Sequence, residues 1–284
     1  MLARFSLSIL LFASASVAAA ATTDAPKKPA ATAAAPLAIG ETFTIDSAVL
    51  GEQRQINVYV PPGYAEGDAR YAVLYMADGG INEDFPHIVG AVDVSVKNGV
   101  MRPLIVVGIP NVERRRDLLS ASAREEDRKI APHAGGADKF RRFIRDELKP
   151  LIAQRYRTTS ESALIGESLA GLFVLETLMT QPDLFDTYIG VSPALWWNDR
   201  ALARGMTAKL ESWNVPGKRV WFASASDDIV EATEVAAVAF RTVNPPKLPW
   251  HYEAMTDQKH STIFPVAALK ALRTLFPPLT DEKK

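Results

Sequence analysis

The chain contains no cysteine among its 284 residues. Disulfides, thiol catalysis and lipid attachment to an N-terminal cysteine are therefore excluded. An excess of charge of one sign is also absent, because 32 Lys and Arg stand against 33 Asp and Glu for a net charge of −1. Such a balance creates no overall field for nucleic acid or an anionic membrane. We expect no nucleic-acid partner, and nothing in the composition indicates an obligate protein partner.

The N-terminus carries an apolar run that is too short for a membrane-spanning helix. Residues 5–17 are mostly apolar but include four serines, and a spanning helix needs about 20 apolar residues. A basic start, this run and the alanines at 18–21 are typical of a secretory signal. We predict a signal peptide over 1–20, export to the periplasm or the extracellular space, and no stable membrane anchor. Residues 21–40, rich in Ala, Thr, Pro and Lys, are predicted to form a disordered linker, and 279–284 a flexible tail.

The remaining chain shows the periodicity of alternating strands and helices. Residues 42–49 and 54–60 alternate with the period of a strand around Gly51, which predicts an antiparallel hairpin. Short β-branched runs then alternate with helical patterns, as in a doubly wound, mostly parallel sheet. We predict one α/β domain over 41–278, with a helix over 137–155 kinked at Pro150. The predicted parallel strands are 71–77, 103–109, 163–166, 187–191, 219–225 and 250–254.

A short segment rich in small residues, Gly166-Glu167-Ser168-Leu169-Ala170-Gly171, separates an apolar strand from a helical pattern. This context is typical of a nucleophile elbow, in which a tight turn raises a serine hydroxyl above the carboxyl edge of the sheet. Ala170 occupies the usual place of the second glycine, and an ordinary strand-to-helix turn is the alternative. We expect Ser168 to be a nucleophile.

The order of residues along the chain selects one histidine as the base. In this arrangement the acid and then the histidine follow the serine. His87 and His133 precede Ser168, and His251 lies inside a predicted strand, where a structural role is expected. His260 lies on a loop before the last helix, at the edge of the sheet where general bases of α/β folds are positioned.

Two adjacent aspartates follow the strand predicted over 219–225. Asp228 is the preferred acid, since it lies a few residues past the end of the strand, and Asp227 is the close alternative. Glu231 is a more distant candidate. The acid would orient and stabilise the imidazolium of His260. Both aspartates could instead cap the following helix.

An oxyanion hole needs two backbone N–H groups directed at the developing negative charge. Leu169, directly after the serine, is expected to supply one. Gly79 and Gly80 follow an early strand, where glycine permits unusual backbone angles, and are expected to supply the other. A plain Asp-Gly turn is the alternative for this loop.

Several stretches in a fixed order from about residue 41 to 277 carry a more specific signal: 73–80, 107–111 with Arg114 and 116–118, 140–156, 166–172, 192–197 and His260. Together they resemble the Putative esterase family, which groups esterase D-like and enterobactin-esterase-like α/β-hydrolases. The resemblance implies an α/β-hydrolase fold. It also implies a serine esterase that forms an acyl-enzyme on Ser168, with His260 as general base and an acid as the third triad member. With the predicted signal peptide, we expect a secreted enzyme that acts on a small-molecule or saccharide ester.

The same resemblance implies that Trp196 and Trp197 wall an acyl pocket, although both could equally belong to the core. Arg114 or Arg116 could reach an acidic substrate, but we favour an ion pair of Arg116 with Asp117 or a neighbour that fixes a loop.

The residue before Ser168 and the motifs that the chain lacks also bear on function. Glu167 stands where a histidine or a smaller neutral residue is usual, so a carboxylate adjoins the nucleophile. A catalytically silent binding protein on the same fold, or an acyltransferase with the same triad, remains the alternative function. No His-Glu-x-x-His, phosphate-binding glycine loop or dinucleotide fingerprint is present, so we expect no metal and no organic cofactor.

Overall fold

The computed structural model of the protein describes residues 33–227 and 229–279. The predicted signal peptide, residues 21–32, the tail from residue 280 and Asp228 lie outside these residues. The fold begins at Ala38, whereas residues 33–37 are exposed and without regular secondary structure.

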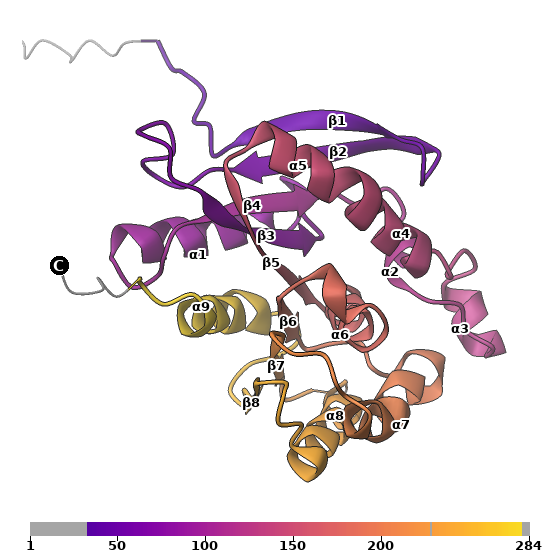
Figure 1. Ribbon diagram of the computed structural model, residues 1–284. Coiled ribbons are helices and arrows are strands. Elements are labelled where there is room, and N and C mark those ends of the chain that lie inside the picture. The colour runs from indigo at the N-terminus through magenta and orange to yellow at the C-terminus, as the bar shows by residue number, and fades with distance from the viewer. Residues whose placement is uncertain (1–32, 228, 280–284) are drawn as a thin grey trace, which may run out of the picture. The chain divides into compact units, whose positions relative to one another are not determined.

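A sheet of eight strands in the order β1-β2-β4-β3-β5-β6-β7-β8 forms the centre of this unit (Figure 1). The first two strands form the predicted antiparallel hairpin, β2 is antiparallel to β4, and all remaining neighbours are parallel. The predicted fold class is therefore confirmed. The strands are β1 (Glu41–Ser47), β2 (Glu52–Tyr59), β3 (Tyr71–Ala77), β4 (Leu104–Ile109), β5 (Thr158–Glu167), β6 (Thr187–Val191), β7 (Arg219–Ser224) and β8 (Trp250–Ala254).

Helices cover both faces of the sheet. One face packs against α1 (Phe85–Lys97) and α9 (Ile263–Leu275), which contact each other (Figure 1). The opposite face packs against α2 (Arg114–Leu118), α4 (Ala137–Phe143), α5 (Lys149–Arg155), α6 (Leu169–Thr180), α7 (Trp197–Glu211) and α8 (Val230–Val243). Alternate residues of one strand therefore enter different cores: Leu74 and Met76 of β3 face the first layer, and Val73 and Tyr75 the second. Burial on both faces is why the central strands are almost entirely apolar.

The helix predicted over 137–155 differs from expectation in its centre. Between α4 and α5 the chain forms a π-helical turn, η1 (Ile144–Leu148), and the Lys149 N–H donates to the Ile144 carbonyl five residues earlier. Pro150, at the start of α5, has no N–H for the carbonyl four residues before it. The π turn takes up this irregularity, so the predicted break is a change of helical register.

Buried ion pairs join the hairpin to α2. Arg54 Nη1 lies 2.6 Å from Asp117 Oδ2, and both side chains are at most 2% exposed. The ion pair expected between Arg116 and Asp117 is present, with Nε 2.7 Å from Oδ1. Arg116 also pairs with Glu52 of β2. This network holds the segment that carries Arg114 against the edge of the sheet.

None of the helices in the described part of the chain is long and apolar enough to cross a membrane.

Candidate active site

Ser168 occupies the turn between β5 and α6 (Figure 1). Its φ of 58° and ψ of −118° lie outside the regions that L-residues usually adopt, as expected for a strained strand-to-helix elbow. The Ser168 N–H donates to Val191 O at the end of β6 (3.0 Å), and its carbonyl accepts from Ala194 N (2.9 Å). These two hydrogen bonds tie the elbow to the neighbouring strand and the loop after it.

Close approaches at this turn explain the unusual place of its second glycine. A Cβ on Gly166 would lie 2.6 Å from the Ala170 Cβ, and one on Gly171 would lie 2.8 Å from the Val191 carbonyl oxygen. The methyl group of Ala170 is fully buried over Gly166. The tight contact of α6 with β6 therefore falls at residue 171, and Ala170 is accommodated without a second glycine at that position.

His260 lies between two serines that come from different strands. Its Nε2 is 3.1 Å from Ser168 Oγ, and its Nδ1 is 2.9 Å from Ser192 Oγ. The loop that carries His260 follows β8, and Ser168 follows β5, so the parallel sheet brings their side chains to one edge. The geometry permits a hydrogen bond from the serine hydroxyl to the imidazole, which a general base requires.

Ser192 is a site residue that sequence reasoning missed. It is fully buried directly after β6, with φ at 39°, and its N–H donates to Ala223 O of β7 (2.8 Å). A hydroxyl oxygen that accepts from Nδ1–H leaves the Nε2 lone pair of His260 directed at Ser168. Ser192 directly follows β6, and β6 lies between the strand before Ser168 and the strand before the predicted acid. This position could have identified it from the sequence.

The three acid candidates have different surroundings. Asp227 Oδ2 accepts the backbone N–H of His260 (2.8 Å), so Asp227 positions the histidine loop through its main chain. Glu231 pairs with Arg200 on the surface, with an Oε1 to Nη1 distance of 2.7 Å, and its side chain is 68% exposed. Glu231 thus has a surface partner, and its role as a more distant acid candidate stays a prediction. Asp228 lies outside the described residues, and its role stays a prediction.

The backbone N–H groups that were expected to form an oxyanion hole have different partners in the structure. Leu169 begins α6, and its N–H has no acceptor among residues 33–227 and 229–279. The Gly79 N–H donates to Ile109 O (3.1 Å), and the Gly80 N–H donates to Glu83 Oε2 (2.7 Å). Neither glycine is free to bind an oxyanion in this structure, so that expectation holds only if the Glu83 carboxylate turns away.

A cluster of carboxylates with one arginine lies beside Ser168. Arg114 binds Asp78 through two hydrogen bonds of 2.7 Å. Burial, together with the charges of Asp84 and Asp78, raises the pKa of Glu167 to about 8, against the lowering effect of Arg114. Glu167 therefore carries a proton at neutral pH, and the residue before Ser168 contributes no full negative charge there.

A small cavity of about 200 Å³ opens at Ser168. It is lined by Arg114, Arg115, Leu119, Ile130, Ala131, Ser168, Leu169, Trp196 and Trp197. Trp197 is 5% exposed, belongs to the core and donates from Nε1 to Ser120 O (3.0 Å), whereas Trp196 is only partly buried. Both tryptophans thus line the cavity and Trp197 also packs in the core, while their role as walls of an acyl pocket stays a prediction.

The described residues contain no group of three or more His, Asp or Glu side chains arranged to hold a metal ion.

Comparison with known proteins gives a consistent family. The family described as "Putative esterase" matches residues 47–263. "Ferri-bacillibactin esterase BesA" of Bacillus subtilis is 34% identical over 165 residues, which are 52% of this chain and 56% of that protein. "Siderophore triacetylfusarinine C esterase" of Aspergillus fumigatus is 39% identical over 83 residues, 28% of each chain. The chain thus matches about half or less of the length of these relatives.

A solved structure supports the same fold. An "IroE-like serine hydrolase" from Shewanella oneidensis superposes with a TM-score of 0.78 at 24% identity, covering 84% of this chain and 80% of that one. At this level of identity the likeness concerns the arrangement of strands and helices.

Proposed function

The chain belongs to the Putative esterase family, and we propose that it hydrolyses carboxylic esters with Ser168 as nucleophile and His260 as general base. One observation carries this proposal: Ser168 Oγ lies 3.1 Å from His260 Nε2, on an elbow whose strained backbone projects the hydroxyl. A serine in an ordinary strand-to-helix turn has no need of a histidine at this distance.

The reaction proceeds in two transfers of the acyl group. His260 Nε2 accepts the Ser168 proton as Oγ attacks the ester carbonyl carbon, and the carbonyl oxygen becomes an oxyanion near the Leu169 N–H. Collapse of this intermediate breaks the bond to the alcohol oxygen, which receives the proton from the imidazolium. Water then attacks the acyl-enzyme by the same route, which releases the carboxylic acid and restores the serine hydroxyl.

The imidazole keeps its orientation through contacts on the far side of the ring. Ser192 Oγ lies 2.9 Å from Nδ1, and Asp227 accepts the His260 backbone N–H. We retain Asp228 as the predicted triad acid. A carboxylate in that position would stabilise the imidazolium that forms during each proton transfer.

Replacement of Ser168 by alanine tests the chemistry. We expect turnover of p-nitrophenyl butyrate to fall by at least about 10³-fold, since loss of a catalytic nucleophile removes most of the rate enhancement. Ser160→Ala, at the exposed opposite end of β5, is the matched control. Turnover that survives in the Ser168 variant would show that the proposed nucleophile is wrong.

Two further assays separate the alternative functions. A fluorophosphonate probe labels only an activated serine, so a wild-type protein that resists labelling would be a silent binding protein. Addition of an alcohol acceptor distinguishes hydrolysis from acyl transfer, because a transferase would yield a new ester as its main product. We expect labelling at Ser168 and the free acid as the main product.

The substrate that we propose is an ester siderophore. The names of the matched relatives describe esterases of ferri-bacillibactin and of a siderophore. Arg115 and the partly buried Trp196 line the cavity at Ser168 and suit the anionic oxygens and flat rings of a catecholate chelator. Arg114, by contrast, is held by Asp78. The predicted N-terminal signal is the ground for proposing export, so hydrolysis would occur in the periplasm or outside the cell.

Arg115 offers a test of this substrate class. Arg115→Met should lower kcat/KM for a ferric tricatecholate ester by about tenfold through loss of a charged contact. It should leave the neutral p-nitrophenyl butyrate almost unaffected. Equal effects on both esters would contradict an anionic substrate.

Mass spectrometry of the mature N-terminus from fractionated cells tests export, and an intact Met1 in the cytoplasm would oppose it.

A further inference from the structure

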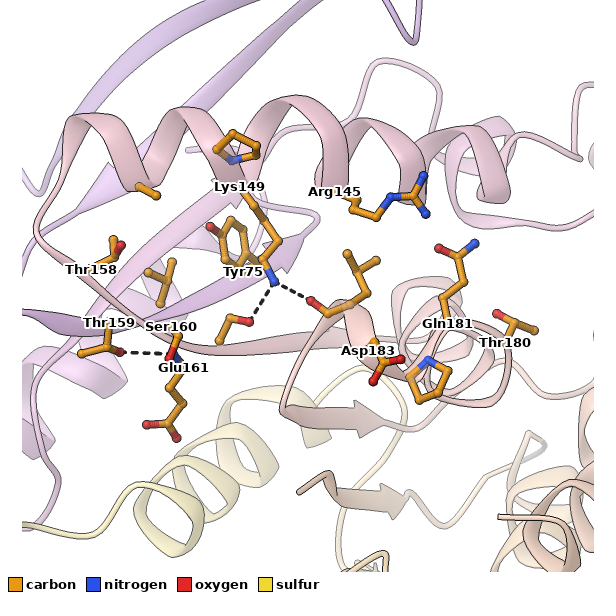
Figure 2. A pocket seen from close by; sticks show the side chains of 16 residues that line it. Tyr75, Arg145, Lys149, Thr158, Thr159, Ser160, Glu161, Thr180, Gln181 and Asp183 are labelled. Atoms are coloured by element: carbon orange, nitrogen blue, oxygen red, sulfur yellow. Dashed lines mark hydrogen bonds between the residues drawn. The ribbon is translucent and has the colours of Figure 1, made fainter. Parts of the chain in front are cut away.

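A second, larger cavity of about 590 Å³ lies at the opposite end of β5 from Ser168 (Figure 2). It is bounded by η1 and α5 on one side and by η2 (Pro182–Leu184) and the start of β5 on the other. Thr158 at its edge is ten residues before Ser168, which at about 3.3 Å per strand residue gives a separation of roughly 30 Å. The proposed ester chemistry makes no use of this cavity.

Lys149 points into the middle of this cavity (Figure 2). Its Nζ donates to Ser162 Oγ (3.0 Å) and to the Leu184 carbonyl oxygen, and it lies 4.6 Å from the centre of the Phe185 ring. An ammonium group has three N–H donors, and the two hydrogen bonds use two of them. The rings of Phe185 and Tyr75 also lie near this group. Burial lowers the pKa of Lys149 to about 8, which indicates a charge that the surroundings do not fully stabilise.

No carboxylate of the described residues forms an ion pair with Lys149. Asp186 is the closest in electrostatic influence, but its oxygens accept from the Ser162 N–H (2.9 Å) and from Lys218 (3.3 Å). Buried charges in proteins are normally paired. The cavity therefore holds a half-buried positive charge with no carboxylate partner among the described residues, and an anion entering it would supply one.

The local backbone supports a built site. The π turn ends at Lys149 and shifts the register of the helix by one residue at this position. Such turns cost regular hydrogen bonding and frequently accompany binding sites.

We propose that this cavity binds an organic monocarboxylate with a short apolar body. The carboxylate accepts a hydrogen bond from Lys149 Nζ. The carbon chain lies along the apolar part of the wall, which is formed by Val73, Tyr75, Pro150, Ala153 and Leu184. The carboxylates of Glu161 and Asp183 also line the cavity and disfavour multiply charged anions. A single negative charge on an apolar chain fits both features.

Three probes of equal chain length test the class of ligand by isothermal titration calorimetry. We expect hexanoate to bind the full protein and hexanol to bind at least about tenfold more weakly, because it lacks the charge-assisted hydrogen bond. Hexylammonium should not bind, since it would oppose the charge of Lys149. Hexanol or hexylammonium binding as tightly as hexanoate would overturn the proposal.

Two variants locate the site. Lys149→Met removes the charge but keeps the apolar stem, and Ala153→Phe fills the cavity from an exposed helix position while Lys149 stays. Each should weaken hexanoate binding at least about tenfold. Lys139→Met, an exposed lysine on the preceding helix, is the control that should not change it. If Lys149→Met fails to fold, Ala153→Phe still decides, and unchanged affinity in that variant would overturn the proposal.

Activity distinguishes this site from the one at Ser168. Hexanoate should bind Ser168→Ala as tightly as wild type, and Ala153→Phe should hydrolyse p-nitrophenyl butyrate at the wild-type rate. Loss of hexanoate binding in Ser168→Ala would place the ligand at the active site and refute the second site.

Discussion

The environment of Glu167, the residue before Ser168, leads to a specific prediction about how the free energy of unfolding depends on pH. Burial raises its pKa from 4.5 to about 8, so the folded protein retains a proton that the unfolded chain releases between these values. The contribution of this group to the free energy of unfolding therefore falls as the pH rises from about 4.5 to about 8, and it is level outside that window. Glu167→Gln removes the titration while keeping the shape of the side chain.

The magnitude follows from the size of the shift. Each pKa unit corresponds to about 1.4 kcal/mol, so a shift from 4.5 to about 8 amounts to roughly 5 kcal/mol over the whole range. Between pH 5 and pH 8 the wild type should lose about 3–4 kcal/mol relative to Glu167→Gln. For a domain of this size, that loss corresponds to a difference in Tm of roughly 10 °C.

Urea unfolding of both proteins at pH 5, 6, 7 and 8 measures the effect. The stabilities should be close at pH 5 and diverge towards pH 8, with the variant the more stable. Glu66→Gln, which alters an exposed carboxylate far along the chain from the elbow, should follow the wild type. Parallel curves for wild type and Glu167→Gln would refute the reasoning that Glu167 is protonated in the folded protein.

Three other substitutions test separate parts of the structure. Ser192→Ala should lower kcat by about tenfold with little change in KM, because it removes a partner that orients His260; equal kcat values would deny that positioning role. Asp117→Asn should cost about 3 kcal/mol in urea unfolding, since it removes the buried charge partner of Arg54 and leaves it only the more exposed Glu52 carboxylate at 2.9 Å. Gly171→Ala should lower Tm by several degrees, because its Cβ would lie 2.8 Å from a backbone oxygen of β6.

Local periodicity determined most of the fold from sequence. The hairpin and the parallel strands were predicted from alternation and β-branched runs, and β3, β6 and β8 have the predicted bounds. These features depend on neighbours within a few residues, which is why a single sequence suffices for them. The π turn before Pro150 was missed, because a proline shows that the regular helix is interrupted but not how the chain recovers.

The candidate site was predictable where chain order and strand ends decide the position. Ser168 and His260 were selected from the order of residues and their loops, and their side chains lie 3.1 Å apart. The catalytic roles of both residues and of Asp228 stay predictions. The fold explains the proximity, since parallel strands bring their carboxyl ends to one edge of the sheet.

Tertiary structure alone decided which polar groups are free and which are occupied. The sequence identified Gly80 as a possible donor, but only packing brings Glu83 to its N–H. It suggested Asp227 as the alternative acid, which stays a prediction, but only the folded loop brings Asp227 Oδ2 to the backbone N–H of His260. The contact of Ser192 with His260, and the lack of a carboxylate partner for Lys149 among the described residues, became visible only in three dimensions. The physical reason is that secondary structure follows from local patterns, while hydrogen-bond partners come from segments far apart in the chain.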